Sequence, residues 1–189
     1  MNRPFPLDAF PLETTRLRLR EFCADDVDDV FAYTSDPEVT RHLILETQHS
    51  REEAVALLAR ALENYHGETP MWAIEYKADR RVAGGCGMRN WDRGSARVEI
   101  SYALARRYWG QGIMGEALGA LIGFGFDRMR LNRIEAHTRP TNTASCRMLE
   151  KLGFLREGIM RQHEFFKGVH QDLALYSLLA NDWRKPVQA

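Results

Sequence analysis

A glycine-rich turn, Trp109–Gly115 (WGQGIMG), constrains the fold of this chain more than any other stretch. It lies where an alternating, strand-like pattern gives way to apolar residues at helical spacing, such as Ala117, Leu118 and Leu121. The first turn of a helix carries N–H groups without intrahelical partners and a partial positive charge. Glycines remove the side chains that would keep an anion away from these groups. The stretch is therefore either a phosphate-binding turn or an ordinary strand-to-helix turn.

A capped helix is predicted downstream of this turn. Asn142 can cap it, Gly153 can end it, and apolar residues such as Met148 and Leu149 recur at three- and four-residue spacing between them. Helix formation alone accounts for this segment. It does not account for the pairing of this segment with the glycine turn.

Together the two motifs resemble those of the GCN5-related N-acetyltransferases, and within them the ribosomal-protein N-terminal acetyltransferases. The family's acyl-CoA turn has the form Gln/Arg-x-x-Gly-x-Gly/Ala, which corresponds here to residues 109–114. Its second motif runs from an Asn, through Ser or Ala three residues on, to Glu-Lys-x-Gly-Phe, and Asn142–Phe154 follows it. The resemblance extends from about Thr15, through Val98–Tyr102, to the closing segment Asp172–Trp183, and so covers almost the whole chain.

The resemblance implies an α/β fold, with antiparallel N-terminal strands in a mixed sheet and a central parallel strand–helix–strand crossover. The hydrophobic pattern agrees, predicting strands at 15–22, 71–76, 81–88, 96–104 and 133–138. Helices are predicted from Asp25 until Pro37 breaks the pattern, from Ser50 to near Gly67, and over 113–129. The unit of strand, helix and strand from 96 to 138 should be a right-handed crossover. Residues 1–14, with three prolines, are expected to form an irregular arm before a single domain at 15–185.

Acetyl-CoA is the cofactor that the resemblance implies, with CoA as the product. Backbone groups of Tyr102, Ala103 and Leu104 would pair with its pantetheine arm, and the Ala103 N–H would polarise the thioester carbonyl. The glycine turn would hold the pyrophosphate. The cofactor-binding residues expected on this basis are Tyr102, Ala103, Leu104, Trp109, Gly110, Gln111, Gly112, Ile113, Met114, Gly115 and Asn142.

Two departures from the family pattern affect the expected chemistry. Trp109 and Met114 stand where the family prefers Gln/Arg and Gly/Ala, which changes side chains but leaves the backbone amides in place. Many relatives carry a Tyr seven residues after the Asn, as the acid that protonates the leaving thiolate, and this chain has Leu149 there. The proton must come from elsewhere, and Ser145 is the candidate. Alternatively, its hydroxyl bonds its own helix backbone.

Two residues are candidates for the base that activates the acceptor amine. Glu99 lies four residues before Ala103 on the same strand face, and His137 lies five residues before Asn142; relatives keep a base at one or the other place. Histidine has the more suitable unperturbed pKa, but either group could act through an ordered water. We favour Glu99 slightly. The alternatives are a solvated carboxylate and a structural histidine.

Composition limits the remaining classes. A chain of 189 residues, 44% of them hydrophobic, is long enough for a single domain with a well-buried core. Its net charge of zero produces no electrostatic field that would favour binding to nucleic acid or to an anionic membrane. Cys23, Cys86 and Cys146 have no zinc-like or disulfide-like spacing, so no metal is expected. Since no stretch resembles a signal peptide or a membrane span, we expect a cytoplasmic protein. The family resemblance is compatible with a homodimer, which the sequence alone does not decide.

The acceptor is the least constrained part of the prediction. The subgroup favours a protein N-terminal α-amine, whose low pKa leaves free base near neutrality. Small-molecule amines (amino acids, polyamines or antibiotics) are the alternative, as is a non-catalytic acyl-CoA-binding module; a nucleotide-binding protein is disfavoured because the P-loop Lys-Ser/Thr is missing. Trp72, Trp91, His42 and Tyr176 are candidates for the acceptor side, although single aromatics are mostly core.

Overall fold

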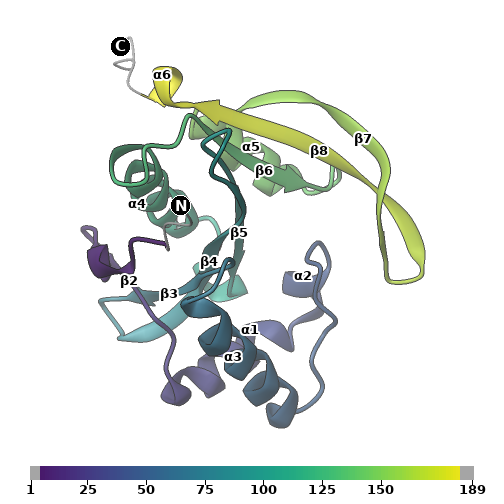
Figure 1. Cartoon of the computed structure of the whole chain (residues 1–189). Helices are drawn as coiled ribbons and strands as arrows, with labels where there is room; N and C mark the ends of the chain where they lie inside the picture. The colour runs from purple at the N-terminus through teal and green to yellow at the C-terminus, as the bar shows by residue number, and fades with distance from the viewer. Residues whose placement is uncertain (1–4, 184–189) are drawn as a thin grey trace.

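The computed structural model describes residues 5–183 and contains one mixed, eight-stranded sheet in the order β1-β2-β3-β4-β5-β6-β8-β7 (Figure 1). Adjacent strands are antiparallel except β5 and β6, which are parallel and joined through helix α4. This confirms the predicted fold class and crossover. The strands are β1 (Leu12–Glu13), β2 (Leu17–Arg20), β3 (Met71–Tyr76), β4 (Arg81–Asp92), β5 (Arg97–Leu104), β6 (Arg133–Thr138), β7 (Leu155–Phe166) and β8 (Val169–Leu179).

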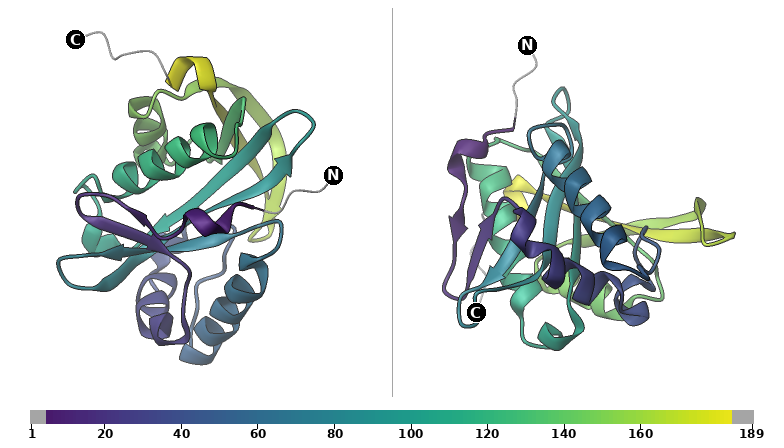
Figure 2. Two further views of the ribbon diagram at one scale, coloured as in Figure 1. Left: turned by 60° about the vertical axis from the view of Figure 1, so that its left-hand side comes forward. Right: turned by 90° about the horizontal axis from the view of Figure 1, so that it is seen from below.

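Helices cover both faces of the sheet, with α1 and α3 on one side and α4 and α5 on the other (Figure 2). The Ser50 hydroxyl accepts a hydrogen bond from the Glu53 N–H and caps α3, as the sequence pattern predicts. Pro37 does not break α1, which ends at Thr34, but begins the next short helix. The α-helices are α1 (Val27–Thr34), α2 (Pro37–Thr40), α3 (Arg51–Tyr65), α4 (Ile113–Asp127), α5 (Thr143–Lys151) and α6 (Ala180–Trp183), with 3₁₀ turns at Leu7–Ala9, Ala24–Asp26 and Arg106–Tyr108.

The two faces of the sheet are distinguished by the strand register. Trp72, Cys86 and Tyr102 are cross-strand neighbours, and because Trp72 stacks on Phe10, which in turn contacts Phe124 of α4, they lie on the α4 side. The residues one position earlier or later, including Ser101, therefore face α1 and α3. This alternation carries Glu99, Ser101 and Ala103 to one face and Tyr102 to the other.

The N-terminal segment is more ordered than predicted. Residues 1–4 of the expected arm, and residues 184–185 at the end of the expected domain, lie outside the described residues. Phe5 is buried, Phe10 packs on the core, and Leu12–Glu13 pairs with β2 as a strand. The expected boundary at residue 15 is therefore too late: the core begins at Phe5, because apolar side chains between the prolines cover Trp72 and α4.

The hairpin of β7 and β8 projects from the sheet (Figures 1 and 2). We predicted the closing segment but no strand at 155–166. Most residues of β7 are exposed on both faces, so no alternation of apolar and polar residues marks it. Among residues 5–183, no helix is both long and apolar enough to cross a membrane.

Candidate active site

The parallel pairing of β5 and β6 stops before either strand ends. Its last register pair is Ile100 and Ala136. Beyond this point β5 continues to Leu104 alongside β4, and β6 continues to Thr138 alongside β8. The two strands therefore diverge and open a gap within the sheet, and two cavities meet there.

The first cavity, called here the cofactor cavity, has a volume of about 600 Å³ and lies against the N-terminal ends of α4 and α5. Ten of the eleven predicted cofactor-binding residues line it. The exception is Gln111, whose side-chain amide donates to the Arg107 carbonyl. Gly110 and Gly112 both have φ of +73°, a conformation that favours glycine, and a Cβ on Gly110 would meet nothing within 4 Å. An open, backbone-lined turn of this kind fits the diphosphate of acetyl-CoA.

Arg16 ties the N-terminal strand region to this turn. Its Nε donates to Glu116 Oε2 at 2.6 Å, its backbone N–H donates to Glu116 Oε1 at 2.9 Å, and its Nη1 donates to the Gln111 carbonyl at 2.8 Å. Thr14 also donates to the Glu116 carboxylate, and these donors lower the pKa of Glu116 despite its partial burial. The contacts hold the start of α4 from outside the cavity.

The alternation of backbone groups along β5 identifies those that face the gap. The Ala105 N–H donates to the Ala83 carbonyl on β4, so the N–H of Ala103 is expected to face β4 as well. The groups of Tyr102 and Leu104 then face the side where β6 has diverged, and the Leu104 carbonyl accepts the indole N–H of Trp109. The register therefore favours Tyr102 and Leu104 over Ala103 as donors toward a thioester.

Ser145 lies at the junction of the two cavities. Its hydroxyl is 2.7 Å from the Tyr102 hydroxyl, and its backbone N–H donates to Asn142, which caps α5 as predicted. Burial raises the pKa of Tyr102 to about 12, so this phenol keeps its proton. Leu149 is fully buried in the core. The sequence pattern gave no sign of the Tyr102 hydroxyl contact, because it joins a strand to a helix 43 residues away.

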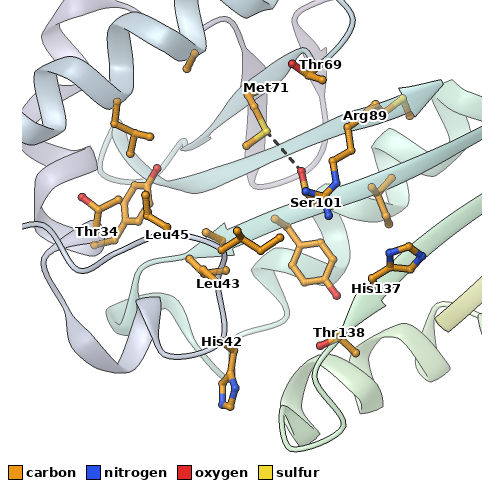
Figure 3. A pocket seen from close by; sticks show the side chains of 18 of the residues that line it. Thr34, His42, Leu43, Leu45, Thr69, Met71, Arg89, Ser101, His137 and Thr138 are labelled. Atoms are coloured by element: carbon orange, nitrogen blue, oxygen red, sulfur yellow. Dashed lines mark hydrogen bonds between the residues drawn. The ribbon is translucent and has the colours of Figure 1, made fainter. Parts of the chain in front are cut away.

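The second cavity, called here the acceptor cavity, has a volume of about 510 Å³ and lies between the sheet, helices α1 and α3, and the loop after α2 (Figure 3). It shares Tyr102, Ala103, Asn142 and Ser145 with the cofactor cavity, as well as His42 and Leu43 from the loop. Figure 3 shows His137, Arg89 and Ser101 along its sheet side. A group in one cavity can therefore reach a group in the other.

The structure brings the two predicted base candidates together. His137 Nδ1 is 3.4 Å from Glu99 Oε1, and the Glu99 carboxylate also accepts hydrogen bonds from Arg89 and Asn90. Glu99 is 4% exposed and does not line the acceptor cavity, whereas His137 does. The ring of His163 on β7 lies edge-on to that of His137, with the ring centroids 6.0 Å apart. Of the two candidates, His137 is therefore the one whose side chain borders the acceptor cavity.

The aromatic candidates for the acceptor side divide differently. Trp72 and Tyr176 are fully buried, and Trp91 packs on Phe5, so none of the three lines the cavity. His42 lines both cavities, and burial, aided by nearby Arg41 and Arg139, lowers its pKa. The sequence reading missed Arg139, which lies in the turn after β6 and has no motif around it. No cluster of residues suited to a metal is present among residues 5–183.

Comparison with known proteins agrees with this geometry. The family model for the acetyltransferase (GNAT) domain matches residues 16–155. An uncharacterised N-acetyltransferase of Bacillus licheniformis, p20, is 36% identical over 176 residues, covering 91% of this chain and 97% of p20. The ribosomal protein uS5-alanine N-acetyltransferase of Escherichia coli is 30% identical over 106 residues, 56% of this chain and 55% of that enzyme. The solved GCN5-related N-acetyltransferase of Brucella melitensis has a TM-score of 0.84 at 27% identity, covering 90% of this chain and 79% of that one. The chain therefore belongs to the GNAT family of acetyl-CoA-dependent N-acetyltransferases.

Proposed function

We propose that this enzyme acetylates a primary α-amine, that of a protein or peptide N-terminus, by direct attack while donor and acceptor are bound together. One observation carries the proposal: the cofactor and acceptor cavities meet at Tyr102 and Ser145, beside His137. Direct transfer needs such a junction, since it must place the acceptor nitrogen within reach of the acetyl group.

The residues at the junction divide the proton transfers between them. When bound, acetyl-CoA supplies a thioester whose acetyl carbon bonds to the amine nitrogen as the carbon–sulfur bond breaks. His137 accepts the proton that the amine loses, directly or through a water, and Glu99 orients its ring. Ser145 donates a proton to the leaving sulfur and takes one from the Tyr102 hydroxyl, 2.7 Å away, and Tyr102 regains its proton from solvent before the next turnover. Backbone N–H groups of Tyr102 and Leu104 polarise the carbonyl.

His137 is preferred to Glu99 as the base because of its position. A buried carboxylate with three hydrogen-bonding or ionic neighbours is already fully engaged. A carboxylate beside a histidine nitrogen fixes the tautomer and the orientation of the imidazole ring. We therefore assign Glu99 as a positioning residue rather than a catalytic one.

Two considerations support an α-amine as the acceptor. An α-amine has an ordinary pKa near 8, so a useful fraction is free base at neutral pH, whereas a lysine side chain is almost fully protonated. The E. coli relative is named as an enzyme that acts on the alanine of ribosomal protein uS5. A polyamine is less suited, because Glu164 is the one acidic residue among those described that line the acceptor cavity.

The test combines binding and turnover. Purified protein is titrated with acetyl-CoA by calorimetry, and CoA release is followed with peptides bearing free or blocked N-termini. We expect transfer to free N-termini alone, and a kcat lower by about 10²–10⁴-fold in His137→Gln with unchanged acetyl-CoA affinity. Glu99→Gln should lower kcat less than His137→Gln. Tight acetyl-CoA binding without transfer to any amine would instead identify a non-catalytic binding module.

The proton relay has its own test. Ser145→Ala should lower kcat by about tenfold or more, and Tyr102→Phe by less, with acetyl-CoA affinity unchanged in both. If the two substitutions act on one proton path, the double variant should be no slower than Ser145→Ala alone. Additive effects would show that Tyr102 acts separately from Ser145.

A further inference from the structure

Arg139 presents unpartnered N–H groups at the wall of the acceptor cavity. The residue is 8% exposed, yet its Nε and Nη2 atoms are buried without a hydrogen-bond partner. A buried guanidinium normally has its donors satisfied, since leaving them unpaired is costly. Arg139 also lies two residues after His137, at the same end of β6. Its free donors therefore border the space where we place the acceptor amine.

The surroundings of Arg139 hold the guanidinium in place without satisfying it. Its Nη1 donates to the Arg41 carbonyl at 2.7 Å, and its guanidinium lies 5.9 Å from the ring of Phe166. The Glu164 carboxylate is an ionic neighbour 4.0 Å from Nη2, too far for a hydrogen bond. The guanidinium is fixed through Nη1, and its Nε and Nη2 have no hydrogen-bond partner among residues 5–183.

The rest of the cavity differs from one side to the other. Arg89, Arg139 and His137 lie at the sheet end, whereas Val30, Leu57 and Leu58 from α1 and α3 form an apolar wall. Arg89 is paired with the buried Glu99, so Arg139 is the cation at this end whose Nε and Nη2 lack hydrogen-bond partners. The cavity thus suits a molecule with an anionic end and an apolar part.

From this arrangement we propose that the acceptor carries a carboxylate close to its amine, and that Arg139 binds this carboxylate through Nε and Nη2 while the apolar part faces α1 and α3. The pair of parallel donors matches the two oxygens of a carboxylate. The inference rests on the proposed function and narrows its substrate class. The carboxylate has two possible sources: the C-terminal group of an amino acid or short peptide, or an acidic side chain beside a protein N-terminus.

Matched acceptors test the carboxylate and separate its sources. Leu-Gly is compared with Leu-Gly amide, and Ala-Asp-Leu amide with Ala-Asn-Leu amide, since each pair shares an amine of similar pKa and differs in one negative charge. In at least one pair, kcat/KM should be higher for the carboxylate by about tenfold or more. A preference in the first pair identifies a free carboxylate, and one in the second identifies an acidic side chain.

Variants connect this preference to Arg139. Arg139→Gln should abolish it, while Arg60→Gln, which removes a cation from the exposed part of the same cavity, should leave it intact. Acetyl-CoA affinity and the melting temperature report on folding. If Arg139→Gln does not fold, Arg139→Lys replaces it, and the preference should fall severalfold because an ammonium cannot present two parallel donors.

The outcomes separate this inference from the proposed function. Equal transfer to carboxylates and amides, or a preference that survives loss of Arg139, overturns the inference and leaves the acetyltransferase assignment in place. Calorimetric binding of Leu-Gly but not of its amide to the CoA-bound protein, with no transfer, supports the inference and overturns the proposed acceptor chemistry. Absence of both binding and transfer across the four peptides overturns the inference.

Discussion

The cofactor cavity and the acceptor cavity differ in which parts of the chain line them and in whether backbone groups or side chains face the ligand. The cofactor cavity is lined by the end of β5, the start of α4 and the N-terminal end of α5, which offer backbone groups, and also by α2 and the loop after it. The acceptor cavity draws its wall from α1, α3, the loop after α2, the end of β6 and the β7–β8 hairpin, and offers side chains. The cofactor cavity can therefore bind the same group even when its side chains are substituted. The acceptor cavity can bind a different ligand when any one of several segments, far apart in the sequence, is changed.

If the comparison is right, substitutions in the glycine turn should weaken acetyl-CoA binding without changing acceptor binding. This is the largest of the effects that we predict. Gly112→Val places a β-branched residue at φ +73°, where its Cβ lies 3.5 Å from Arg16 Nη2, and so strains the turn that offers its backbone to the diphosphate. We expect the acetyl-CoA dissociation constant to rise by about 100-fold, measured by calorimetry. Gly168→Val imposes the same strain at φ +76° in the hairpin turn and is the matched control. Equal loss of acetyl-CoA binding in both variants would contradict the comparison.

A smaller effect on the same cavity should come from outside it. Arg16→Gln removes the side-chain contacts to Glu116 and to the Gln111 carbonyl without removing any residue of the cavity wall. The start of α4 should loosen and raise the acetyl-CoA dissociation constant by about five- to tenfold, while KM for the acceptor stays unchanged. Arg18→Gln, which breaks an exposed ion pair with Glu13, is the control and should have no effect. An unchanged affinity in Arg16→Gln would mean that the turn is rigid by itself.

Substitutions in the β7–β8 hairpin should instead affect mainly the binding of the acceptor. Lys167 Nζ donates to the carbonyl of Thr40, the last residue of α2, at 3.1 Å and so ties the hairpin turn to this helix. Lys167→Met should raise the acceptor KM by about two- to fivefold and the acetyl-CoA dissociation constant by less, since Val39 and Arg41 beside Thr40 line the cofactor cavity. Lys77→Met removes a similar tie to the Thr14 carbonyl, away from both cavities, and should change neither constant. A rise in the acetyl-CoA dissociation constant that equals or exceeds the rise in the acceptor KM would contradict the comparison.

The smallest predicted effect is on stability at acid pH. Hydrogen bonds from Arg133 and Ser177 lower the pKa of Glu157 to about 2, which helps to anchor β7. Because the folded pKa lies below the ordinary value of 4.5, this stabilisation is present above about pH 4.5 and is lost as the pH falls toward 2. Glu157→Gln should therefore reduce the fall in melting temperature between pH 5 and pH 3 by about 1–3 °C. The expected effect is small because the carboxylate is partly exposed and solvent screens its interactions.

Glu63→Gln, at an exposed position on α3, is the control for this pH series and should follow the unsubstituted protein. Acceptor binding should weaken before acetyl-CoA binding as the pH falls, since the hairpin contributes to the acceptor wall and not to the cofactor wall. Parallel loss of both would contradict the comparison.

The same contrast explains what could be predicted from the sequence. The family, the crossover and the cofactor wall were predictable because Gly110, Gly112 and Asn142 act through local backbone geometry. Glu99 and His137 were left as alternatives, since their contact depends on the register of two parallel strands. The neighbouring sequence did not indicate a role for Arg139, because its Nη1 atom is held by the carbonyl of Arg41, 98 residues away in the sequence.

The early end of the β5–β6 pairing has a consequence for stability. It leaves a strand edge in the interior of the sheet, where the N–H groups of Tyr102 and Leu104 face the gap and have no β6 partner in the register. Interior edges of this kind are the places where a sheet opens most easily. A ligand that supplies acceptors along the gap acts as a missing strand, so acetyl-CoA should slow amide hydrogen exchange at these two residues and raise the melting temperature. In the cell, the supply of acetyl-CoA would then set how often the sheet opens, and with it the lifetime of the folded enzyme.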